Sequence, residues 1–104
     1  EFCTFNPMIR HSVIFTLNTP IGSVKEAEFL SAAAKLSTIP GVRNFESLRQ
    51  TSKKNDFDFG LSMEFDTAED YAGYNIHPHH KAFIQDFWLT TVDKFLEIDF
   101  EPIA

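Results

Sequence analysis

Nine residues near the middle of the chain alternate without interruption between large apolar residues and small or polar ones. Every second residue of segment 57–65 is large and apolar: Phe57, Phe59, Leu61, Met63 and Phe65. An extended chain turns successive side chains to opposite faces, so this period of two predicts a strand with one buried face. The polar run 52–56 before it predicts a turn, and segment 42–51 before that turn predicts a partner strand whose irregular spacing indicates a bulge or a twist.

The chain before this hairpin predicts a strand followed by a helix. Residues 8–18 alternate with a period of two, and His11 falls on the apolar face of that strand. Ser23 and Glu26 have the spacing of a capping box, which is typical of a helix start. Ile39-Pro40-Gly41 then predicts the end of the helix.

The chain after the hairpin predicts a helix that is interrupted and then a last strand. Asp66 and Thr67 supply cap residues to a helix that must end before Pro78, and proline is well suited to the first position of the next helix. Alternation over 94–101 predicts the last strand. The order strand, helix, strand, strand, broken helix, strand indicates the α+β class and a ferredoxin-like βαββαβ fold, with a four-stranded antiparallel sheet and helices on one face.

Length and charge limit the partners that this chain would bind. We interpret residues 1–7 as an N-terminal tail of upstream or vector origin, and residues 8–104 as a single domain. A net charge of −6 argues against nucleic acid and against an anionic membrane surface. The absence of a long apolar run or a leader, together with the single Cys3, favours a cytoplasmic protein.

Three of the four histidines lie in the short segment 77–80, which begins three residues after Tyr74. If a helix starts at Pro78, His80 shares a face with Phe83 and Phe87 and points toward the sheet. His79 is rotated by roughly 100° from His80 and should face solvent. The remaining one, His77, lies at the helix break, where its ring nitrogen is suited to cap the new helix.

His80, Tyr74 and His11 therefore form a candidate catalytic group, for which two interpretations stay open. In the first, a neutral histidine acts as a general base on a carbon next to a carbonyl, a tyrosine hydroxyl holds that carbonyl, and no cofactor is needed. In the second, the three side chains only satisfy one another inside the core. The candidate contacts to a small ligand are His77, Phe15, Phe29, Phe83 and Phe87.

A metal site is a third alternative for the histidines. His11, His77 and His80 offer three imidazoles, but their spacing is not the i, i+4 pair with which a helix holds zinc. We therefore predict no metal and no cofactor.

Several of these segments together resemble one family. They are Met8-Ile-Arg-His11-Ser-Val-Ile-Phe15, Ile39-Pro-Gly-Val42, Asp58-Phe-Gly-Leu-Ser-Met-Glu-Phe65, and Tyr74 followed by His77-Pro78, His80 and Phe83. The combination is similar to the stress-responsive A/B barrel (Dabb) family over residues 8–102. The resemblance implies a homodimer in which two sheets face each other in an α+β barrel, as expected of one self-complementary surface.

The resemblance also implies roles for the candidate residues. A plant member of the family is a polyketide cyclase that closes its substrate by an aldol condensation, with the second histidine of its His-Pro-x-His segment as base and a tyrosine of the preceding helix. These positions correspond to His80 and Tyr74, with the strand histidine at His11. Ala33 is small where that cyclase has an aromatic residue, so the pocket shape does not carry over. Two hypotheses follow: a homodimeric binding protein of undetermined biochemical role with a small apolar pocket, or a cofactor-independent cyclase, lyase or isomerase.

Overall fold

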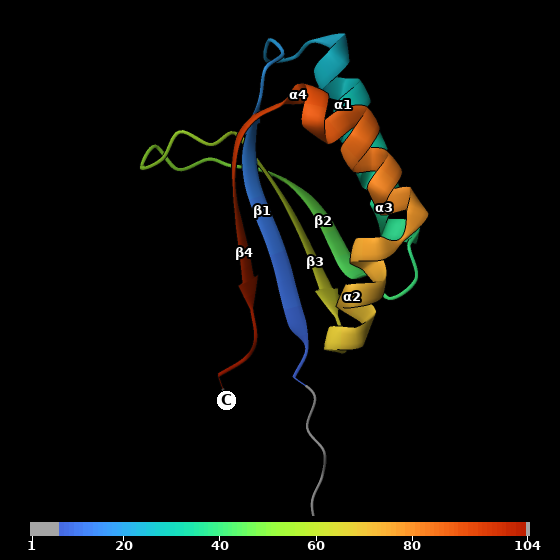
Figure 1. Ribbon diagram of the computed structural model, residues 1–104. Helices are drawn as coiled ribbons and strands as arrows, with labels where there is room; N and C mark the ends of the chain where they lie inside the picture. The colour runs from blue at the N-terminus through green and yellow to red at the C-terminus, as the bar shows by residue number, and fades with distance from the viewer. Residues whose placement is uncertain (1–6, 104) are drawn as a thin grey trace, which may run out of the picture.

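A four-stranded antiparallel sheet carries all the helices on one of its faces (Figure 1). The computed structural model describes residues 7–103, so the predicted tail lies almost entirely outside the described residues. The strands are β1 (Ile9–Leu17), β2 (Arg43–Arg49), β3 (Phe59–Phe65) and β4 (Val92–Phe100), in the spatial order β2-β3-β1-β4. This is the predicted ferredoxin-like arrangement, and the predicted fold class is confirmed.

Helix α1 (Val24–Ala34) begins where the capping residues predict. The Glu26 amide donates to the Ser23 hydroxyl, and the Glu26 carboxylate in turn accepts a hydrogen bond from the Gly22 amide. A short 3₁₀ helix, η1 (Lys35–Thr38), continues α1 to the buried Ile39. The Ser23 hydroxyl thus satisfies one of the first amides of α1, which have no partner within the helix, and the Glu26 carboxylate fixes the chain just before the cap.

The second helical region is broken as expected. Helix α2 (Ala68–Ile76) is capped by the Thr67 hydroxyl, and α3 (Pro78–Phe83) starts at the predicted proline. The π-helix η2 (Ile84–Trp88) and the short α4 (Leu89–Thr91) follow without interruption and lead into β4. The predicted irregularity in β2 is also present, since its pairing with β3 shifts between Arg43 and Glu46, where Asn44 has a φ of 50°.

The core lies between the helices and the inner face of the sheet. Phe15 is fully buried, with its ring centroid 5.6 Å from that of Phe29, 5.7 Å from Phe59 and 5.3 Å from Trp88. These side chains come from both layers. Burial of apolar surface between them, at about 25 cal/mol per Å², is the main force that holds the helices on the sheet.

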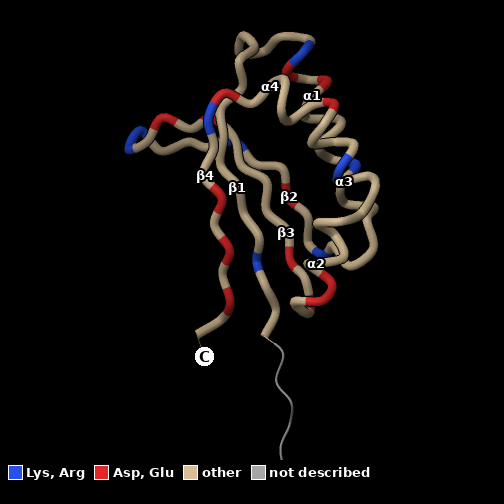
Figure 2. Tube along the Cα trace, viewed as in Figure 1, with Lys and Arg blue, Asp and Glu red and all other residues tan. Residues whose placement is uncertain are grey.

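Strand β4 turns its apolar alternation away from this core. Leu96 pairs with Ile14, which pairs with Gly60, which pairs with Leu48, so these residues form one row across the open face of the sheet. Ile98 and Phe100 share that face, whereas Glu97 and Asp99 point toward the helices. Figure 2 shows the acidic residues gathered along β4. On the open face, strands β1 and β3 carry both polar and apolar side chains. Strands β4 and β2 add a band of exposed apolar side chains to it.

Among residues 7–103, no helix combines the length and the apolar character needed to cross a membrane.

Replacement of Phe15 by alanine should lower the free energy of unfolding by about 3–5 kcal/mol, because it removes a fully buried ring and leaves a cavity. Ile21→Ala serves as the control, since Ile21 is 69% exposed and its truncation should change stability by less than ~0.5 kcal/mol. Urea denaturation followed by tryptophan fluorescence measures both. Equal effects of the two substitutions would contradict the central position of Phe15.

Candidate functional site

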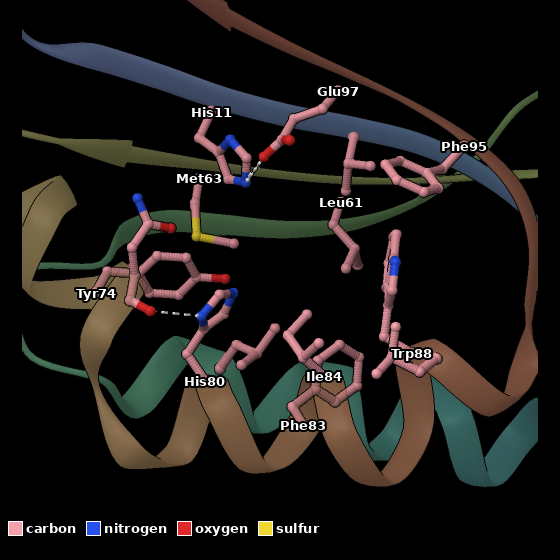
Figure 3. Close-up of a pocket in the computed structure, with 14 residues that line it drawn as sticks. His11, Leu61, Met63, Tyr74, His80, Phe83, Ile84, Trp88, Phe95 and Glu97 are labelled. Carbon is pink, nitrogen blue, oxygen red and sulfur yellow. Dashed lines mark hydrogen bonds and ion pairs between the residues drawn. The ribbon is translucent and has the colours of Figure 1, made fainter.

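A cavity of about 360 Å³ lies between the helices and the inner face of the sheet (Figure 3). Its volume is within the range of small-molecule sites, and its wall is mostly apolar with a few polar groups, which is also typical of such sites. The strands contribute His11, Val13, Leu61, Met63, Phe95 and Glu97, and the helices contribute Leu36, Tyr74, Asn75, His80, Phe83, Ile84, Trp88 and Leu89. The three predicted catalytic candidates therefore border one space.

The break between α2 and α3 orients His80. His77 is extended (φ −65°, ψ 137°) and its Nδ1 atom accepts a hydrogen bond from the His79 amide, at 3.1 Å. The Asn75 carbonyl then accepts from Nδ1 of His80, at 3.2 Å. A carbonyl oxygen only accepts, so Nδ1 carries the proton and Nε2 of neutral His80 keeps its lone pair.

Burial keeps His80 neutral near physiological pH. Desolvation of the half-buried ring lowers the pKa of His80 below its ordinary value of 6.5. The hydrogen bond to Asn75 opposes this shift, the nearby His11 adds to it, and Glu97 opposes it. The ring is thus a potential general base whose available nitrogen is Nε2.

Tyr74 lies against His80 and supplies a protonated hydroxyl. The two ring centroids are 4.4 Å apart, and the Tyr74 hydroxyl is directed into the cavity (Figure 3). Desolvation, followed by the charge of Glu97, raises the pKa of Tyr74 well above its ordinary value of 10. A hydroxyl that stays protonated is a hydrogen-bond donor for a ligand carbonyl.

His11 is held by acidic and phenolic groups that the sequence analysis did not identify. Its Nδ1 lies 2.6 Å from Oδ1 of Asp99, and the Tyr71 hydroxyl donates to Oδ2 of the same carboxylate at 2.8 Å. On the other side of the ring, Nε2 lies 3.6 Å from Oε2 of Glu97. Asp99 accepts from Nδ1, so the ring is fixed at the cavity wall, and Glu97 becomes its ion-pair partner when the ring is protonated.

Desolvation and the hydrogen bond to Asp99 raise the pKa of Tyr71 well above 10. Tyr71 precedes Tyr74 by three residues, so helical periodicity was a signal that could have found it. Glu97 and Asp99 gave no such signal, because they alternate with apolar residues in β4.

The other predicted contact residues divide between the cavity wall and the structure around it. Of the five candidate contacts, Phe83 borders the cavity. Phe15 and Phe29 are fully packed behind it, Phe87 stacks on the outer side of Phe83, and His77 caps α3. No group of three metal-ligating side chains is brought together within residues 7–103, so the three-histidine arrangement does not form in the described chain.

Comparison with known proteins agrees with this architecture. The family model described as "Stress responsive A/B Barrel Domain" (Dabb) matches residues 9–102. A crystal structure of a Dabb family protein with a ferredoxin-like fold from Mesorhizobium loti is 52% identical, covering 94% of this chain and 99% of that chain with a TM-score of 0.92. Comparison with curated proteins gives no match.

More distant structures share the fold alone. A dimeric ferredoxin-like protein of unknown function from Thermobifida fusca is 20% identical, with coverages of 93% of this chain and 92% of that chain and a TM-score of 0.77. The hydroxynitrile lyase from Passiflora edulis is 13% identical, with coverages of 93% and 94% and a TM-score of 0.81.

The fold and the cavity define a ferredoxin-like α+β domain with a histidine- and tyrosine-lined space between its sheet and its helices. The chain belongs to the stress-responsive A/B barrel domain family, as the resemblance implied.

The two tyrosines of the sequence, Tyr71 and Tyr74, should stay protonated when the native protein is taken to about pH 10, the ordinary tyrosine midpoint. When the pKa of a tyrosine is higher in the folded state than in the unfolded state, its contribution to stability is fully present below the unfolded pKa. That contribution is lost as the pH rises through the folded pKa. Ultraviolet difference spectroscopy measures tyrosinate directly. The urea-unfolded chain is the control and should ionise near pH 10; ionisation of a native tyrosine at that pH would contradict the site geometry.

Proposed function

We propose that this protein binds a small, mostly apolar carbonyl compound in the cavity and that His80 removes a proton from the carbon next to the carbonyl. The observation that carries the proposal is the hydrogen bond from Nδ1 of His80 to the Asn75 carbonyl, since it leaves Nε2 as the basic atom beside Tyr74. The family and the fold are shared with proteins of different or undetermined roles, so the activity is argued from the site itself.

The proposed reaction needs only groups of the chain. The lone pair of Nε2 takes the proton, the electrons of the broken C–H bond move into the carbonyl, and the Tyr74 hydroxyl donates a hydrogen bond to the resulting enolate oxygen. The enolate then attacks a second carbonyl of the same molecule, or the protonated His80 returns the proton to a different carbon of a conjugated enolate. In the first case the protonated His80 returns its proton to the new alkoxide. These outcomes correspond to an aldol-type cyclase and to an isomerase.

We further propose that the protein works as a homodimer joined through the open face of the sheet. Leu48, Leu96 and Phe100 are 46%, 47% and 54% exposed on that face, which is unusual for a surface that meets only water. Arg10 and Glu64 on the same face pair with each other, so burial would leave neither charge without a partner. The dimeric state of the Thermobifida fusca protein supports this assembly.

His80→Ala should abolish exchange of the protons next to the carbonyl of a bound methyl ketone for deuterium. Loss of a general base costs about 10²- to 10⁴-fold in rate, and loss of the enolate-stabilising donor in Tyr74→Phe should cost about 10²- to 10³-fold. Proton NMR in deuterium oxide follows the exchange.

The matched control is His79→Ala, which removes an exposed histidine from the same helix. It should retain the exchange rate of the wild type. Added imidazole should partly restore exchange in His80→Ala, because it supplies the missing base. An unchanged exchange rate in His80→Ala would show that His80 is not the base. If the wild type binds the ketone without exchanging its protons, the protein binds a ligand but does not catalyse the proposed step.

Leu96→Lys combined with Ile98→Lys should convert the dimer into a monomer, because each subunit would bring two ammonium groups without partners into the interface. Ile76→Lys is the control, since Ile76 is 69% exposed on helix α2 away from the open face. Light scattering at micromolar concentration measures the assembly. A wild-type monomer under these conditions would overturn the proposed dimer.

A further inference from the structure

A second hollow lies outside the cavity, in the groove between α1 with η1 on one side and α3 with η2 on the other. Its volume is about 440 Å³. Ala32 and Ala82 keep it open, because their small side chains leave space between the two helical segments, and Lys35 and Asp86 stand at its border. A groove with this lining suits a hydrocarbon chain better than a charged group.

Two side chains border both hollows: Leu36 from η1 and Phe83 from α3. Leu36 and Phe83 are only 4% and 6% exposed, so both side chains are tightly packed where the two hollows meet. The Phe83 ring is fixed from several sides, with its centroid 5.4 Å from that of Phe29 and 6.0 Å from that of Phe87. Leu36 and Phe83 therefore form a wall between the cavity and the groove.

We propose that this wall sets the length of ligand that the cavity accepts. The inference rests on the proposed function, because it concerns the carbonyl compound bound beside His80. A space of 360 Å³ equals roughly a dozen water volumes at ~30 Å³ each, which corresponds to a compact ligand. The part of a longer apolar tail that outgrows the cavity stays buried only if it passes between Leu36 and Phe83 into the groove, and in the wild type these two packed side chains block that route.

The test measures the binding of linear methyl ketones of increasing chain length to the folded protein. Trp88 is the single tryptophan and borders the cavity, so its fluorescence reports binding. Wild-type affinity should rise about fourfold for each additional buried methylene and then stop rising once the chain fills the cavity. Leu36→Ala should extend the rise to longer chains, because it joins two hollows and more than doubles the space open to a ligand.

The matched control is Leu61→Ala. Leu61 is 3% exposed, borders the cavity, and has no contact with the outer groove, so the same atoms are removed without an opening in the wall. For chains just beyond the wild-type limit, Leu36→Ala should bind more than about tenfold tighter than Leu61→Ala, the gain from burying two further methylenes.

Equal shifts of the length limit in the two variants would overturn the inference, since the inner volume alone would then decide the limit. Failure of every ketone to bind the wild type would instead reject the proposed function. If either alanine variant does not fold, as judged by circular dichroism, Leu36→Val and Leu61→Val make the same comparison with a smaller loss of contacts, and an equal shift there is equally decisive.

Discussion

The interruption of the helix at His77 and Pro78 is the constraint on which the site depends. In an unbroken helix the His79 amide would donate to the Asn75 carbonyl, four residues earlier. Here that amide donates to the His77 ring, and the Asn75 carbonyl is left to accept from Nδ1 of His80. The break thus does more than change the direction of the chain: it decides which nitrogen of His80 faces the cavity.

The fold and part of the site were predictable because their signals are local. Ser23, Thr67 and Pro78 begin their helices as the capping and proline rules require, and the predicted strand boundaries lie within about two residues of those observed. The position of Pro78 also sets the phase of α3, which is why the inward direction of His80 could be predicted. The positions of Phe15 and Phe29 behind the cavity could not, because spacing along a strand or a helix indicates a buried face but not which buried residues leave a space.

Strand β4 shows where a single sequence is insufficient. Its alternation of Leu96, Ile98 and Phe100 with acidic residues is compatible with either face of a sheet. Pairing with β1 turns Glu97 and Asp99 inward against His11, which places two carboxylates where the rule of apolar residues inside would put none. Both carboxylates lie on an edge strand and keep much of their surface in solvent, 54% for Glu97 and 42% for Asp99, while Asp99 also makes hydrogen bonds with His11 and Tyr71. Leu96, Ile98 and Phe100 then lie on the open face of the sheet. The acidic and the apolar residues of β4 thus lie on opposite faces of the sheet.

Burial has opposite chemical consequences for His80 and Tyr74 at the cavity wall. A low-dielectric surrounding disfavours the charged form of any side chain, so the same desolvation lowers the pKa of His80 and raises that of Tyr74. At neutral pH the pair therefore consists of a base without its proton and a donor that retains its proton. The surroundings of the two side chains set this state, with desolvation as the largest effect on each. Glu97 strengthens one half of the pair and weakens the other, since its charge further raises the pKa of Tyr74 but opposes the lowering at His80. Desolvation remains the largest effect on the pKa of both groups.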